Sequence, residues 1–393
     1  SEIKTVEDLL EYLDSDKKRE DVTQKKERVF AFSRYRLGSY PKETSTSSTS
    51  FPKVYRSNLE DLFEKKESFV FGKNKDSILV LTIRKTLSAE GVLRSIYRIK
   101  ELIQCDGTLG NIMIVSHDDF SGSVLYSFFK SLKRENSLDF LKYVYIENAL
   151  YADSEIDAII QKEIEAAADT SILYTKKGRH VLGMIKEEGL LEEQKFLINK
   201  ESVFVVIGGA SGATYSILKR LLLEYGCFVC IVGRRNQENV SGSLAELEST
   251  APGKVRYYSA NILKKGALEE VFSDVYKKYG KIDVCINGAG VLDINFLHNK
   301  EEEILKNEFN TKVTSSLEIV DLAKKYSLKK VVLFSSIISY FGSSGQSVYG
   351  AANMFLNGLC RDTDSTDSVV NVINWPAWNN VGMTENANVL HAL

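Results

Sequence analysis

The chain has 393 residues, with 51 basic and 53 acidic side chains and a net charge of −2. Such a length predicts at least two domains, each with its own hydrophobic core. The near-neutral, interspersed charge gives no support for nucleic acid or a membrane surface as a partner. No apolar run reaches the length of a membrane span, and the first twenty residues are acidic and amphipathic rather than a signal peptide, so we expect a cytoplasmic protein.

The first 50 residues are predicted to be a charged helical extension that ends in a flexible linker, TSTSSTS. Residues 51–197 come next, and from Ser77 their apolar runs SILVLTI, NIMIVS and LKYVYIE alternate with amphipathic helices, which predicts a parallel α/β sheet. Asp118 and Asp119 follow the second of these strands, where carboxylates would repel a pyrophosphate. This part is therefore predicted to be a degenerate, structural dinucleotide fold without cofactor.

Residues 198–393 repeat the architecture, now with a phosphate-binding turn. The run VFVVIGGASGATYSILKRLLLEYG has the order of strand, glycine-rich turn and helix, in which the backbone can approach a pyrophosphate at the helix N-terminus. The next strand ends in Gly-Arg-Arg, where enzymes that use NAD usually carry an acid, and two guanidiniums favour a ribose phosphate. NADPH is therefore the expected cofactor. The residues expected to hold it are Gly208, Gly209, Ala210, Ser211, Gly212, Ala213, Arg234 and Arg235.

Two further patterns suggest metal or redox chemistry only weakly. Cys227 and Cys230 form a C-x-x-C, but they lie in CFVCIVG, which is typical of a buried parallel strand with side chains three apart on opposite faces. The five cysteines are predicted to be reduced thiols. The four histidines show no ligand spacing, so no metal site is expected.

Four polar residues have a spacing suited to carbonyl reduction. Lys312 falls on a predicted helix, Ser336 ends the apolar strand before the next helix, and Tyr349 and Asn353 lie one turn apart on that helix. Hydride that arrives at a carbonyl carbon drives negative charge onto the oxygen, which must be held and protonated. We expect Tyr349 to donate the proton, Ser336 to be the second donor, Lys312 to lower the tyrosine pKa from ~10, and Asn353 to hold Lys312 or a relay water.

From Asp76 to the C-terminus the chain resembles the ketoreductase domain of a modular polyketide synthase, within the short-chain dehydrogenase/reductase superfamily. In that family the catalytic lysine precedes the serine and an asparagine follows the tyrosine by four, as Lys312 and Asn353 do here. Free-standing reductases of the superfamily instead carry a lysine four residues after the tyrosine, where this chain has Asn353. The matching stretches are GGASGAT, the Gly-Arg-Arg step, NGAGVLD, NTKV, FSSIISYFGSSGQSVYGAAN and INWPAWNNVGM.

The resemblance implies an α/β fold of two Rossmann-like parallel-sheet subdomains, the first structural and the second a catalytic short-chain reductase. It implies NADPH-dependent reduction of a β-ketoacyl thioester to the β-hydroxyacyl thioester during polyketide chain extension. The substrate would be carried by phosphopantetheine on an acyl carrier protein, among neighbouring polyketide synthase domains. Further cofactor contacts are implied at Asn261, Ile262, Asn287, Gly288 and Ala289, and substrate or stereocontrol positions at Ile294, Phe341, Gln346 and Met383.

Several positions depart from the family pattern. Asn261 replaces an aspartate, Ile207 and Thr214 replace residues of the glycine turn, and WPAW replaces W-G-P-W. Ile294 replaces an aspartate associated with the D-hydroxyl product, and Phe341 stands where a tryptophan accompanies the L product, so an L-β-hydroxy product is expected. Two alternatives remain open: a catalytically silent structural domain of this kind, and a different NAD(P)-binding short-chain reductase.

Overall fold

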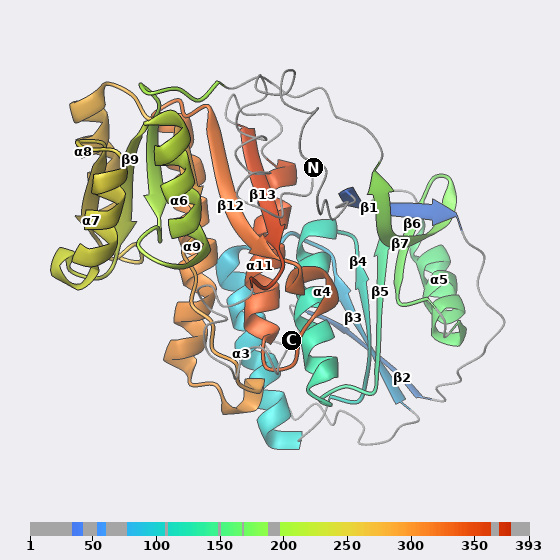
Figure 1. Cartoon of the computed structure of the whole chain (residues 1–393). Coiled ribbons are helices and arrows are strands. Elements are labelled where there is room, and N and C mark those ends of the chain that lie inside the picture. Colours follow the sequence, from blue (N-terminus) through green and yellow to red (C-terminus); the bar gives the residue numbers. More distant parts are fainter. Residues whose placement is uncertain are drawn as a thin grey trace, which may run out of the picture.

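Two sheets organise the chain, and the two α/β halves built on them lie side by side (Figure 1). The computed structural model describes residues 34–41, 53–59, 77–106, 109–147, 151–166, 169–187, 197–362 and 369–378. No helix within these ranges is long and apolar enough to cross a membrane. They also hold no group of histidine, cysteine and acidic side chains suited to a metal ion.

The first half contains seven strands and three described helices. The strands are β1 (Arg34–Pro41), β2 (Lys53–Asn58), β3 (Ser77–Ile83), β4 (Asn111–Ser116), β5 (Phe140–Ile146), β6 (Ser171–Thr175) and β7 (Gly178–Glu187). The helices are α3 (Ala89–Asp106), α4 (Asp119–Arg134) and α5 (Asp153–Glu165). The three strands predicted from the apolar runs are β3, β4 and β5, and each pairs in parallel with its neighbour along the chain.

The strand order of the first sheet offers no crevice for a dinucleotide among the described strands. The order is β1-β7-β6-β5-β4-β3-β2, so the parallel strands β2 to β6 are added in one direction and their order never reverses. Dinucleotides bind at the carboxyl edge of a sheet where the order does reverse. In addition, the N-terminus of α4 is capped by its own chain, because the Asp118 carboxylate accepts a hydrogen bond of 2.8 Å from the Ser121 backbone N–H. The carboxylate thus takes the place at which a helix N-terminus would bind phosphate.

The predicted helical extension is wrong for residues 34–41. This segment is strand β1, which pairs antiparallel with β7, with Arg34 opposite Glu187 and Pro41 opposite His180. Its partner lies far along the sequence, and a local pattern of charged residues does not reveal such pairing. Residues 1–33 of the predicted extension, and the Ser/Thr linker, lie outside the described residues.

The second half is a six-stranded parallel sheet with helices on both faces. Its strands are β8 (Val203–Ile207), β9 (Phe228–Gly233), β10 (Val255–Ser259), β11 (Val284–Asn287), β12 (Lys330–Ser336) and β13 (Val369–Trp375). Its helices are α6 (Gly212–Tyr225), α7 (Ser241–Thr250), α8 (Ala267–Tyr279), α9 (Glu302–Lys325), α10 (Ile338–Phe341) and α11 (Ser347–Asp362), with the 3₁₀ turns η1 (Gln237–Val240) and η2 (Leu297–Asn299).

The order of this second sheet, β10-β9-β8-β11-β12-β13, reverses between β8 and β11. That order is the doubly wound arrangement in which the first strand lies at the centre and a ligand crevice opens at the carboxyl ends on either side of it. Cys227 and Cys230 are buried free thiols that pack into different cores, one on each face of the sheet, which confirms the buried-strand interpretation of their C-x-x-C.

The two halves share a continuous core in which α3 and α4 pack against α9 and α11 (Figure 1). Glycines allow the close approach of α11 to α4. A Cβ added to Gly358 would lie 2.0 Å from the ring of Phe120, which itself packs edge-on against Phe355 with 4.7 Å between ring centroids. Gly350 faces Ser127 of α4 in the same way, at 3.2 Å from the added Cβ to the hydroxyl. The helix that follows the Ser336 strand is therefore seated directly on the first half.

Gly358→Ala should lower the free energy of unfolding by about 1 to 3 kcal/mol, because the new methyl group overpacks the contact with Phe120. The matched control is Gly242→Ala in α7, where an added Cβ meets nothing within 4 Å. That change should leave stability unchanged or raise it by roughly 0.5 to 1 kcal/mol through helix propensity. Urea denaturation of both variants measures the difference, and equal stabilities would contradict the close packing of α4 on α11.

Candidate active site

A cleft of about 790 Å³ opens at the carboxyl ends of the second sheet, around its point of strand-order reversal. It collects most of the predicted residues from seven separate stretches of the chain. Those that line it are Gly208, Ala210, Ser211, Gly212, Ala213, Arg234, Arg235, Asn261, Ile262, Gly288, Ala289, Lys312, Ser336, Gln346 and Tyr349. Gly209, Asn287, Asn353, Ile294 and Phe341 lie outside the lining, and Met383 lies outside the described residues.

The glycine turn fits the pyrophosphate of a dinucleotide. Gly208 has a φ of +82°, which side chains disfavour, and an added Cβ would approach the backbone nitrogen of Ala289 to 3.0 Å. Helix α6 begins at Gly212, and the residue before it, Ser211, makes no side-chain cap hydrogen bond, so its N–H groups remain available to an anion. This helix end contrasts with that of α4, which Asp118 caps.

Two arginines extend the cleft at the end of β9. Both side chains are exposed, and Arg235 lies within 3.4 Å of the Ser211 hydroxyl of the glycine turn. The Tyr257 hydroxyl donates to the Arg235 carbonyl at 2.6 Å and so holds the backbone of this segment. Two exposed guanidiniums beside the turn can pair with a phosphate group.

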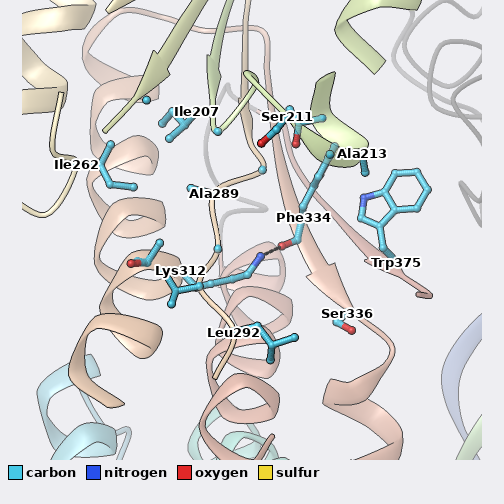
Figure 2. A pocket seen from close by; sticks show the side chains of 18 of the residues that line it. Ile207, Ser211, Ala213, Ile262, Ala289, Leu292, Lys312, Phe334, Ser336 and Trp375 are labelled. Atoms are coloured by element: carbon cyan, nitrogen blue, oxygen red, sulfur yellow. Dashed lines mark hydrogen bonds between the residues drawn. The ribbon is translucent and has the colours of Figure 1, made fainter. Parts of the chain in front are cut away.

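Lys312 reaches the cleft from α9. Its Nζ donates a hydrogen bond of 2.6 Å to the carbonyl of Phe334 in β12, and Figure 2 shows the side chain extended across the site to that oxygen. Burial lowers the lysine pKa to about 8. The same nitrogen lies 5.9 Å from the centre of the Tyr349 ring.

The expected lowering of the Tyr349 pKa is wrong for this structure. Burial raises the tyrosine pKa to about 12, a hydrogen bond from Asn353 opposes the rise, and the charge of Glu308 adds to it. Desolvation is the largest effect because the side chain is buried, and the Lys312 ammonium donates its hydrogen bond to the Phe334 carbonyl rather than to the phenol. A phenol with a raised pKa keeps its proton at neutral pH and remains a proton donor.

Of the remaining candidates, Ser336 and Gln346 line the cleft and Asn353 does not. Ser336 is buried at the end of β12, and its hydroxyl accepts a bond of 3.3 Å from the Ile338 N–H. Asn353 does not hold Lys312; its Nδ2 donates to the Tyr349 carbonyl at 2.8 Å. Its Oδ1 is buried and has no hydrogen-bond partner among the residues that the structure describes, which leaves it available to a water. Gln346 is a buried residue of the lining, and its Oε1 also has no hydrogen-bond partner among the described residues.

Two predicted cofactor residues lie outside the lining and make structural contacts. The Asn287 side chain is buried and donates to the hydroxyls of Ser315 and Ser316 at 3.0 Å each, so it fastens β11 to α9. Gly209 allows close packing, because an added Cβ would lie 2.6 Å from Leu218 of α6. Both are needed for the shape of the cleft without lining it.

The sequence analysis missed some of the lining. Asn307 and Thr311 of α9 border the cleft, and their side chains are hydrogen-bonded at 3.3 Å. Their four-residue spacing beside Lys312 is a signal that helical periodicity could have provided. Thr214, noted only as a departure from a family pattern, packs where Gly288 has no side chain: a Cβ there would lie 2.1 Å from its hydroxyl. Trp375 borders the other side of the cleft (Figure 2).

Comparison with known proteins found chains similar to this one. Residues 202–380 match the family model described as the KR domain. The polyketide synthase PksN of Bacillus subtilis (strain 168) is 23% identical over 337 residues, which cover 84% of this chain but 6% of PksN. The 3-oxoacyl-[acyl-carrier-protein] reductase FabG of Thermotoga maritima is 28% identical over 165 residues, 41% of this chain and 66% of FabG.

Solved structures show the same fold. A ketoreductase domain from the bacillaene assembly line aligns with a TM-score of 0.69 at 20% identity, over 91% of this chain and 88% of that one. A-type ketoreductases from a modular polyketide synthase give a TM-score of 0.73 at 16% identity, over 91% and 85%. Residues 202–380 are thus similar to KR domains, and the chain shares the fold of the solved ketoreductase domains.

Proposed function

We propose that the chain reduces a β-ketoacyl thioester, carried on an acyl carrier protein of the same synthase, to the β-hydroxyacyl thioester with NADPH. The observation that carries the proposal is the convergence of Tyr349, Ser336 and Lys312 on one cleft that also holds an open phosphate-binding helix end. The relatives agree in kind, since FabG is named as a reductase of 3-oxoacyl groups on acyl carrier protein. Oxidation of NADPH in the presence of a small β-ketothioester tests the activity directly.

The residues of the cleft divide the chemistry between them. A bound nicotinamide cofactor supplies the hydride. The Tyr349 phenol and the Ser336 hydroxyl donate hydrogen bonds to the ketone oxygen, and Tyr349 transfers its proton as negative charge develops there. The Lys312 ammonium, 5.9 Å from the tyrosine ring, favours that charge electrostatically. Asn353 offers its unpaired Oδ1 to a water that can replenish the proton.

Tyr349→Phe should reduce kcat by about a hundredfold or more while leaving the dissociation constant of NADPH unchanged, because only the proton donor is removed. Tyr258→Phe is the matched control, since this phenol of β10 donates to Asp274 of α8 and does not line the cleft. Steady-state kinetics with a β-ketothioester and fluorescence titration of NADPH measure the two quantities. If the wild-type protein binds NADPH but reduces no ketothioester, the alternative of a catalytically silent structural domain holds instead.

Lys312 should set an upper limit on the pH range of reduction. With a pKa of about 8 the ammonium is present below that pH and lost above it, whereas Tyr349, with a pKa of about 12, keeps its proton throughout. The kcat/KM of reduction should therefore fall as the pH rises through about 8, and Lys312→Met should be slow at every pH without this fall. A profile between roughly pH 6 and 10 measures it.

Lys130 provides the matched control for this titration. Burial also lowers its pKa to about 8, but its Nζ donates to the Tyr340 carbonyl at 2.7 Å and it does not line the cleft. Lys130→Met should keep the fall in rate near that pH, whatever its absolute rate. If kcat/KM no longer fell near pH 8 in Lys130→Met but still did so in Lys312→Met, the titrating group would be Lys130 and the prediction would be contradicted.

Replacing Arg234 and Arg235 together by alanine should weaken NADPH binding far more than NADH binding. Each charge-assisted hydrogen bond to the 2′-phosphate contributes about 1.5 to 3 kcal/mol, less where water screens the exposed guanidiniums. Arg256→Ala is the control, because that arginine pairs with Asp274 outside the cleft. Dissociation constants for both cofactors decide the matter, and equal losses for NADPH and NADH would show that the arginines do not contact a phosphate.

A further inference from the structure

Two loops of the second half each contribute a residue to the lining of the cleft. The first is residues 292–297, which follow β11, and the second is residues 342–346, which lead into α11; we call them the groove loops. Leu292 of the first and Gln346 of the second line the cleft. The loops are joined to each other, because the Asn295 N–H donates to the Gly345 carbonyl at 3.1 Å. The first loop contains Ile294 and the second follows directly on Phe341, the two positions expected to influence stereochemistry.

A single carboxylate from the other half of the molecule binds both groove loops. Glu135 follows the last turn of α4 and is 6% exposed. Its Oε2 accepts a hydrogen bond of 3.0 Å from the Leu297 N–H, and its Oε1 accepts one of 3.2 Å from the Gly345 N–H. Burial raises the pKa of Glu135, while these two bonds and the charge of Lys300 oppose the rise. A buried carboxylate is retained only where several donors meet it, as they do here.

The first groove loop is also held by Lys300. Lys300 has a fully buried side chain, and its Nζ binds the Asp293 carbonyl, the Asp293 Oδ2 at 3.2 Å and the Glu308 Oε2 at 3.0 Å. Glu308 lies one helical turn before Lys312 on α9, so this network connects the loop to the helix that carries the catalytic lysine. One end of the loop is thus tied to α9, and Glu135, together with the Asn295–Gly345 hydrogen bond, holds the other end next to residues 342–346.

We propose that Glu135 is a positioning residue for the substrate: by holding the two groove loops at a defined separation, it determines which face of the ketone is presented for reduction. This inference rests on the proposed ketoreductase function. Selection between two faces depends on small differences in how the chain enters the groove, so a loop displacement too small to unfold the protein is enough to change it. The first half would then contribute to specificity although none of its described residues lines the cleft.

The test is Glu135→Gln, which keeps the size of the side chain but leaves one N–H facing an amide group that donates. Chiral chromatography of the reduced thioester should show the ratio of the major to the minor β-hydroxy product falling by about tenfold. The dissociation constant of NADPH should stay within about twofold, because Glu135 binds neither the glycine turn nor the two arginines. If Glu135→Gln does not fold, Glu135→Asp, which keeps the charge and shortens the reach, replaces it.

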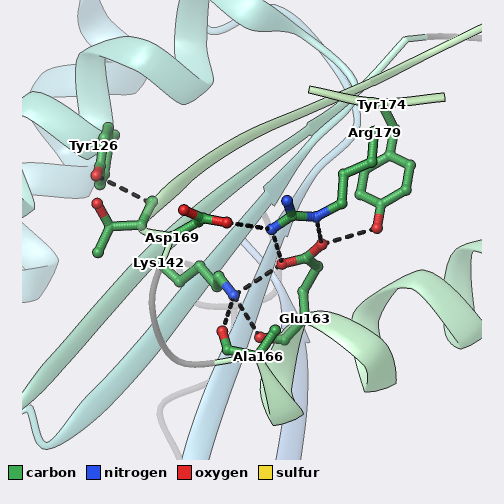
Figure 3. Close-up of polar contacts among 8 residues, drawn as sticks. Tyr126, Lys142, Glu163, Ala166, Asp169, Tyr174 and Arg179 are labelled. Atoms are coloured by element: carbon green, nitrogen blue, oxygen red, sulfur yellow. Dashed lines mark hydrogen bonds and ion pairs between the residues drawn. The ribbon is translucent and has the colours of Figure 1, made fainter. Parts of the chain in front are cut away.

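A matched control comes from another buried glutamate of the same half. Glu163 accepts hydrogen bonds from Arg179 at 2.6 Å and Tyr174 at 2.8 Å and pairs with Lys142 at 2.8 Å (Figure 3). Helix α5, which carries it, packs on the face of the first sheet away from α4 and the second half (Figure 1). Glu163→Gln should lower stability but leave the product ratio unchanged. An equal fall in the ratio for both variants would overturn the proposal, since general destabilisation would then explain it.

Hydrogen exchange separates this inference from the proposed function. The amides of Leu297 and Gly345 should exchange faster in Glu135→Gln than in the wild type and stay unchanged in Glu163→Gln, with no substrate present. A wild-type protein that reduces no ketothioester would overturn the function, yet the exchange rates would still show whether Glu135 holds the loops. Unchanged exchange, or faster exchange with an unchanged product ratio, would overturn the positioning role.

Discussion

The packing of α4 on α11 is the contact on which the rest of the molecule depends. Helix α11 carries Tyr349 and Asn353, and its glycines let it approach a helix from the other half more closely than side chains would permit. Ridges and grooves formed by small residues fix both the distance and the rotation of paired helices. The rotation of α11 determines where the Tyr349 phenol lies relative to Ser336 of β12. The first half, none of whose described residues lines the cleft, thus acts on the position of the proposed proton donor.

Burial sets the electrostatic character of the cleft more than pairing does. The tyrosine and the lysine are both enclosed, and enclosure moves their pKa values in opposite directions, each toward the uncharged form. Near neutral pH the phenol is therefore uncharged, and the ammonium is close to losing its proton, so the site is poised to respond to charge that develops on a substrate oxygen. Water would weaken that response by screening it. The acidic network of Glu308 and Asp293 lies nearby, and Lys300 balances part of its charge.

Local patterns predicted much of this architecture. The strands β3, β4, β5 and β8, the glycine turn and the helix positions of Lys312, Tyr349 and Asn353 follow from periodicity and from residues with restricted backbone freedom. Strand β1 was misassigned because its partner β7 is remote, and the direction of the Tyr349 pKa was wrong because desolvation depends on neighbours from several elements. The role of Glu135 was invisible for the same reason, since both N–H groups that it binds lie more than a hundred residues away along the chain.

The capped N-terminus of α4 favours folding of this helix before α11 has been synthesised. The first half reaches the end of α4 long before α11 is translated, and domains generally begin to fold as they emerge. The Asp118 cap stabilises the first turn of α4 without a ligand, which favours early formation of this helix. Its apolar face is then available to pack against α11. Nascent chains would therefore be most exposed to misassembly in the interval before α11 arrives, and slow translation there would lengthen that interval.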